Sequence, residues 1–175
     1  ASSDVTLTTM DPATGLRRIR NGETNLGDLV ADAYRVVMGA DIGMVNGGGI
    51  RADIEAGNVT YEDIINVHPY GNEMCLAVAT GQEILDALEL GAMNAPLEDG
   101  GFQHVSGLTY TIDLSIPSSV VLDATGSFAG VAGPYRVTNV LVNGQPLDVN
   151  STYTVASHNY MIKEGGSGFN MFMDN

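Results

Sequence analysis

Three consecutive glycines at positions 47–49 limit what this part of the chain can form. Glycine lacks a Cβ, so it adopts backbone angles closed to other residues and lets a ligand approach the main chain. The apolar residues 42–45 precede the glycine run, and this order predicts a strand that ends in a tight loop. With Asn46 before the loop and Arg51 after it, backbone N–H groups such as that of Gly48 would lie beside a guanidinium, an arrangement that suits an anion or a polar planar ligand. The alternative is a plain tight turn, and the three glycines alone do not distinguish a binding loop from such a turn.

Composition indicates one folded domain over residues 1–175, with 44% hydrophobic and 16% charged residues. The net charge of −14 argues against a general nucleic-acid binder, which would normally show a basic face. The single cysteine, Cys75, excludes an internal disulfide and is expected to be buried as a small hydrophobe. No stretch resembles a signal peptide or a membrane span. The chain begins abruptly at Ala1, so we expect a fragment of a longer protein.

Helix signals are concentrated in the first half of the chain. Thr24 begins a predicted helix that Gly39 ends, and Thr60 and Thr80 each start a capping box. The apolar positions of the first helix recur at helical spacing, at Leu26, Leu29, Val30, Ala33 and Val37.

Strand signals dominate the second half. Alternating strands are predicted there at residues 108–114, 135–142 and 153–157, and Asn143-Gly144 predicts a hairpin. Two further strands are expected earlier in the chain, a short one at residues 5–9 and a buried one at residues 74–79. This order favours an α+β fold, with a mixed β-sheet and flanking helices, over a regular alternation of strands and helices.

Self-contained catalysis has little support in the sequence. His68, His104 and His158 are far apart and form no ligand-spaced pair, so no metal site is predicted. Ser167 resembles a nucleophile in a glycine-rich loop, but the nucleophile-elbow pattern requires glycine where Phe169 stands. No Walker motif follows the glycine run. We therefore predict no catalytic residue in this chain.

A binding surface is better supported. Arg20 and Arg51 could make bidentate contacts to phosphate or carboxylate. Tyr70 and Tyr160 lie in turn-rich contexts, where two aromatic faces can clamp a planar base. The alternative is that both tyrosines only cover the edge of the core.

Four motifs together carry a resemblance to a known family. The motifs are residues 20–29 (RNGETNLGDL), 46–51 (NGGGIR), 68–72 (HPYGN) and 165–169 (GGSGF). With these motifs the chain resembles the C-terminal, substrate-binding domain of the 5′-nucleotidase and UDP-sugar hydrolase family over essentially its whole length. Each motif is weak alone, but their order and separation make the resemblance specific.

The resemblance implies a role in nucleotide hydrolysis. Family members join this domain to an N-terminal metallophosphoesterase domain that holds two divalent metal ions and the catalytic groups, and they are extracellular, periplasmic or attached to the cell wall. By position, Arg20 and Arg51 match arginines that contact the phosphate end of the substrate. Asn46 matches a pocket asparagine near the base, and Tyr70 the first stacking aromatic.

Two positions depart from the family pattern. Ser167 replaces an aspartate that binds the ribose hydroxyls, and a serine cannot accept two hydrogen bonds from a diol as a carboxylate does. The second stacking aromatic would fall on Met161, while Tyr160 is one residue further away, so a one-residue insertion would restore it. Two other functions stay open: a free-standing nucleoside- or sugar-binding module, and a structural or dimerisation domain with a decayed pocket.

Overall fold

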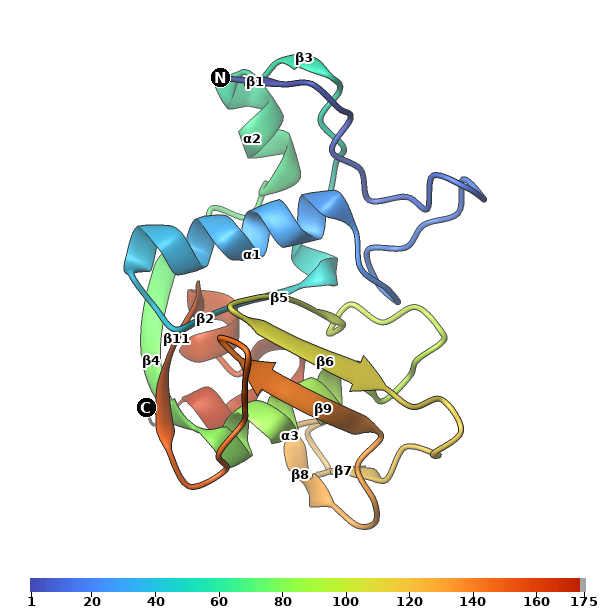
Figure 1. Cartoon of the computed structure of the whole chain (residues 1–175), viewed down its shortest axis with the longest axis vertical. Coiled ribbons are helices and arrows are strands. Elements are labelled where there is room, and N and C mark those ends of the chain that lie inside the picture. The colour runs from blue at the N-terminus through green and yellow to red at the C-terminus, as the bar shows by residue number, and fades with distance from the viewer. Residues whose placement is uncertain (174–175) are drawn as a thin grey trace.

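A four-stranded mixed sheet lies between two helical layers in the computed structural model, which describes residues 1–173 (Figure 1). Its strands are, in order, β4 (Met74–Thr80), β11 (Thr152–His158), β2 (Ile42–Asn46) and β5 (Gln103–Ser106). Strands β11 and β2 run parallel, and the other pairs are antiparallel. The expected α+β class with a mixed sheet is therefore confirmed.

Helix α1 (Asn25–Met38) covers one face of this sheet. The Thr24 side chain accepts a hydrogen bond from the Gly27 N–H at 3.1 Å, and Gly39 ends the helix with φ of 64°. Both predicted ends are correct, because an oxygen-bearing cap satisfies a free N–H at the start and glycine adopts left-handed angles at the end.

The predicted buried side of α1 was only partly right. Leu26 and Val30 are buried, whereas Leu29 and Val37 are 46% and 70% exposed. The helix turns its small residues to the sheet instead. A Cβ at Gly27 would overlap the His104 ring, and the Ala31 carbonyl lies against Gly43.

The other layer contains α3 (Gly81–Ala92), α4 (Asn159–Ile162) and the 3₁₀ turns Gly166–Gly168 and Asn170–Phe172. Beside it lie a three-stranded sheet and a two-stranded hairpin. These comprise β6 (Leu108–Ile112), β9 (Val137–Val142) and β10 (Gln145–Pro146), and β7 (Val120–Leu122) with β8 (Phe128–Val131). The predicted hairpin at Asn143-Gly144 joins β9 to β10, and both turn residues have positive φ.

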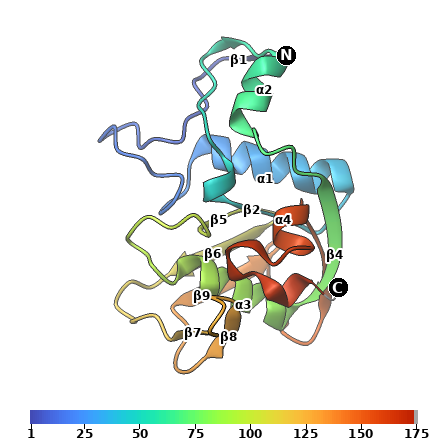
Figure 2. The same ribbon diagram turned by 180° about the vertical axis from the view of Figure 1, so that it is seen from behind.

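Helix α2 (Tyr61–Val67) and the pair β1 (Ser2–Ser3) and β3 (Gly57–Asn58) lie on the side of α1 away from the sheet (Figure 2). The capping boxes at Thr60 and Thr80 both form as predicted, before α2 and α3.

Two strand predictions need correction. Residues 5–9 form only an isolated bridge between Leu7 and Ile54, because side chains of Asp53 and Asn25 accept the N–H groups of Thr9 and Thr8 that a neighbouring strand would have accepted. Strand β4 is buried on one face only. Its other face is exposed because β4 lies at the sheet edge and α1 lies mainly over β2 and β5; this face carries Met74, Leu76 and Val78. Cys75, on the opposite face, is buried as expected.

A buried charged residue fastens α3 to β9. The Glu89 side chain is fully buried, and its carboxylate accepts hydrogen bonds from the backbone N–H of Arg136 at 3.0 and 3.1 Å and of Val137 at 2.9 Å. The Arg136 guanidinium donates in turn to carbonyls at the end of α3, including those of Ala92 at 3.1 Å and Ala95 at 2.9 Å. Neither charge is therefore without hydrogen-bond partners, which buried ionic groups require.

Candidate binding site

A cavity of about 440 Å³ lies where β2 ends. All the residues that line it are uncharged: Asn46, Gly48, Gly49, Tyr70, Asn72, Gly100, Tyr160 and Ser167. Five of the seven predicted binding residues are thus brought to one place, from three segments far apart in sequence. The two that are not among the lining residues are the arginines, Arg20 and Arg51.

The glycine run forms the 3₁₀ turn Gly47–Gly49 directly after β2. A Cβ at Gly47 would overlap the carbonyl of Ile19, so only glycine permits this approach of two backbones. The Gly48 N–H donates to the Gly100 carbonyl at 2.9 Å. The turn is therefore tied to the loop around Gly100, which forms another part of the wall.

Asn46 is 4% exposed, and its amide is engaged at both ends. Its Nδ2 donates to the Gly100 carbonyl at 3.0 Å, and its Oδ1 lies 3.0 Å from His158 Nε2. One N–H and one lone pair of the amide stay available to a ligand.

Tyr160, rather than Met161, reaches the cavity. Strand β11 ends at His158, and Tyr160 follows it in α4. This helical turn directs Met161 into the core, where it is fully buried, and leaves Tyr160 37% exposed.

Tyr160 and Ser167 are joined by a hydrogen bond. The Ser167 N–H donates to the Tyr160 hydroxyl at 3.1 Å, and the Ser167 hydroxyl lies 3.4 Å from the same oxygen. Ser167 has φ of 58°, a left-handed conformation that is uncommon for serine. The Tyr160 ring also lies flat against Gly166, where any Cβ would overlap it. Backbone strain and a close glycine contact thus fix the ring's position.

Tyr70 stands on a turn at the rim, 60% exposed, and Gly71 follows it with φ of 66°. Asn72 in the same turn, together with Gly49 and Gly100, lines the cavity but was missed from the sequence. The signal for Asn72 was its place within the quoted HPYGN motif.

The arginines flank the glycine turn outside the cavity wall. Arg51 is exposed and its Nη1 donates to the Gly48 carbonyl at 3.4 Å. Arg20 is half-buried, and its own carbonyl accepts from the Asp99 N–H at 2.8 Å. Neither forms an ion pair within 4.0 Å among residues 1–173, although the chain is strongly acidic. That the two guanidinium groups contact a phosphate or carboxylate stays a prediction.

The histidines do not assemble a metal site. His68 and His158 both contact the edge of Tyr34, with ring centroids 6.4 and 6.1 Å from it, so the fold brings together two that the sequence separates. Within the described residues, no group of three or more His, Cys, Asp or Glu side chains could hold a metal ion. The same part of the chain contains no helix long and apolar enough to cross a membrane.

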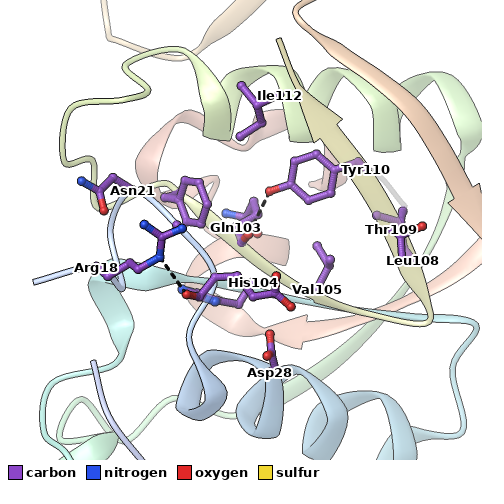
Figure 3. Close-up of a pocket in the computed structure, with 13 residues that line it drawn as sticks. Arg18, Asn21, Asp28, Gln103, His104, Val105, Leu108, Thr109, Tyr110 and Ile112 are labelled. Atoms are coloured by element: carbon purple, nitrogen blue, oxygen red, sulfur yellow. Dashed lines mark hydrogen bonds between the residues drawn. The ribbon is translucent and has the colours of Figure 1, made fainter. Parts of the chain in front are cut away.

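A second cavity, of about 360 Å³, lies between the start of α1, β5 and β6 (Figure 3). Asp28 points toward it from α1, and the Tyr110 hydroxyl donates to the Gln103 carbonyl at 3.1 Å on its far side. Burial, followed by the charges of Glu23 and Asp32, raises the pKa of Asp28 to about 6. None of the seven predicted binding residues lines this cavity.

Comparison with known families agrees with this geometry. Residues 5–174 match the family described as "5′-nucleotidase, C-terminal domain". The chain belongs to this family. The domain is 36% identical over 163 residues to the trifunctional nucleotide phosphoesterase protein YfkN of Bacillus subtilis, covering 89% of this chain and 10% of that protein. It is 32% identical over 158 residues to a 5′-nucleotidase of Vibrio cholerae, covering 89% of this chain and 24% of the relative.

The 5′-nucleotidase C-terminal domain also matches solved structures. A 5′-nucleotidase precursor from Thermus thermophilus superposes with a TM-score of 0.81 at 34% identity, over 100% of this chain and 32% of that one. The domain therefore spans between a tenth and a quarter of these two curated relatives, and about a third of the solved neighbour.

Proposed function

We propose that this domain recognises the nucleoside part of a nucleotide within a larger phosphoesterase that hydrolyses nucleotide phosphate esters. One observation carries the proposal: a cavity with uncharged walls places two tyrosines and two asparagines beside a glycine turn that two arginines flank. Aromatic faces suit a planar base, amides suit its polar edge, and guanidinium groups suit the phosphate. The two relatives, a nucleotide phosphoesterase and a 5′-nucleotidase by name, support the same class of substrate.

The catalytic centre belongs elsewhere in this proposal. An N-terminal metallophosphoesterase domain of the same protein would supply two divalent metal ions, and the complete protein would be exported. The partial coverage of longer nucleotidases supports such a partner domain. The present domain would then bind the substrate and present its phosphate to that centre.

The purified 175-residue chain should bind adenosine or uridine but should not release phosphate from AMP, with or without Mn²⁺ or Zn²⁺. The reason is that the described residues contain no cluster able to hold a metal ion. A phosphate-release assay beside a calorimetric titration separates the two properties. Metal-dependent phosphate release that a chelator abolishes would contradict the assignment of catalysis to another domain.

Ser167→Asp should make the cavity favour ribonucleosides. A carboxylate can accept two hydrogen bonds from a vicinal diol, and hydrogen bonds to a charged group contribute about 1.5–3 kcal/mol. We expect the preference for adenosine over 2′-deoxyadenosine to rise about tenfold. Aspartate and asparagine tolerate the left-handed backbone similarly, so Ser167→Asn is the matched control. If this preference rises equally in both variants, or does not rise in Ser167→Asp, a charge at position 167 does not recognise the ribose hydroxyls.

A further inference from the structure

We propose that His158 is a positioning residue that fixes the orientation of the Asn46 amide and thereby the wall of the nucleoside cavity. The inference rests on the proposed function for its effect on binding, while its geometric part stands on the contacts alone. His158 does not line the cavity; it lies behind Asn46, 2% exposed, as the last residue of β11.

The Gly100 carbonyl determines which way the amide points. A carbonyl oxygen only accepts hydrogen bonds, so the group 3.0 Å away on Asn46 must be the Nδ2 donor. The amide oxygen is then directed at His158 Nε2, also at 3.0 Å. The same Gly100 carbonyl accepts the Gly48 N–H at 2.9 Å. One oxygen thus receives a donor from the residue before the glycine turn and a donor from within the turn.

This arrangement also assigns the tautomer of His158. Because Asn46 Oδ1 accepts, the ring proton must be on Nε2, which leaves Nδ1 as a bare lone pair. Nδ1 is buried and makes no hydrogen bond among residues 1–173, and only the backbone of His158 itself would favour a second ring proton. Burial, followed by the nearby His68, lowers the pKa of His158 to about 4. The other titratable rings that contact it are Tyr34 from α1 and Tyr160 from α4, at 6.1 and 6.0 Å between centroids.

Loss of the His158 donor would affect the cavity through Asn46. Without it Asn46 Oδ1 would be a buried acceptor with no donor, and the Gly100 carbonyl alone would hold the amide. Any half-turn of the less restrained amide would direct its oxygen at the Gly100 carbonyl oxygen. Two acceptors cannot bond, so the loop at Gly100 would move away from the glycine turn. Gly49 adjoins the same contact, since a Cβ there would lie 3.2 Å from Asn46 Oδ1 and 3.8 Å from His158 Nε2. Both glycines line the cavity, so its shape depends on this hydrogen bond.

The test compares His158→Leu with His158→Gln in the full 175-residue chain. Glutamine can offer an N–H to Asn46 Oδ1, whereas leucine cannot. We expect His158→Leu to bind adenosine at least tenfold more weakly than the parent, and His158→Gln to recover most of the affinity. Thermal unfolding of both variants shows whether each is folded. Equal binding by a folded His158→Leu and the parent would overturn the proposal, as would equal losses in both folded variants.

NMR of the ¹⁵N-labelled imidazole rings measures the tautomer and the protonation state of His158, which a purely structural role would not determine. The parent should show the Nε2–H tautomer of His158, neutral from pH 8 down to about 5. An Nδ1–H tautomer, or protonation near pH 6.5, would overturn the proposal even if neither variant folds. If the parent binds no nucleoside, the proposed function fails, and the tautomer still decides the geometric inference.

Discussion

Replacing Glu89 by alanine should lower the free energy of unfolding by about 2–6 kcal/mol, because each buried donor left without a partner costs about 1–3 kcal/mol and two donors are affected. The carboxylate accepts from the N–H groups of both Arg136 and Val137, so its loss leaves two buried donors unpaired. Denaturant unfolding followed by circular dichroism measures the difference.

Two control variants accompany Glu89→Ala: one removes the charge but keeps an acceptor, and the other removes an exposed carboxylate elsewhere. Glu89→Gln keeps one acceptor oxygen and should lose less than the alanine variant. Glu73→Ala removes an exposed side chain that has no hydrogen bond within the described residues, and should change stability by less than about 0.5 kcal/mol. If Glu89→Ala is as stable as Glu73→Ala, the contact between α3 and β9 does not stabilise the fold.

Removing either ring of the proposed clamp should weaken nucleoside binding at least tenfold, or about 1.4 kcal/mol. Tyr70→Ala and Tyr160→Ala each remove one stacking face, and base–aromatic stacking contributes about 1–3 kcal/mol per base in other proteins. Ser167→Ala should cost less than either, because a serine hydroxyl contributes fewer hydrogen bonds to a sugar than a carboxylate. Calorimetric titration with adenosine and uridine compares the three variants with the parent.

Tyr70→Phe is the matched control for the rim ring, since it keeps the aromatic face and should bind like the parent. Tyr61→Ala removes an 80% exposed tyrosine on α2 and should have no effect. The clamp is wrong if Tyr160→Ala binds like the parent while Ser167→Ala does not.

Local chemistry made the helices and the hairpin predictable. Thr60, Thr80 and Gly39 act within a few residues of themselves, so their capping roles can be read without the tertiary structure. The same is true of Asn143-Gly144, whose positive φ values suit a two-residue hairpin turn. The exposed face of β4 and the close packing of α1 on the sheet through Gly27 and Ala31 were missed, because both depend on how α1 lies over the four strands.

The site was predictable mainly through the family motifs. Residues of three of the four motifs line the cavity at the end of β2, and Tyr160, which was expected in the clamp, lines it while Met161 is buried. That choice depends on the short helix α4 and on the contact between the Tyr160 ring and Gly166. His158 was missed as a neighbour of Asn46, since 112 residues separate the two.

A crystal structure of the 175-residue chain grown with adenosine tests the central claim most directly. The account predicts the purine between the rings of Tyr70 and Tyr160, with its polar edge toward Asn46 or Asn72 and its sugar toward Ser167. Adenosine bound instead in the second cavity beside Tyr110, or bound on a surface away from both tyrosine rings, would contradict it.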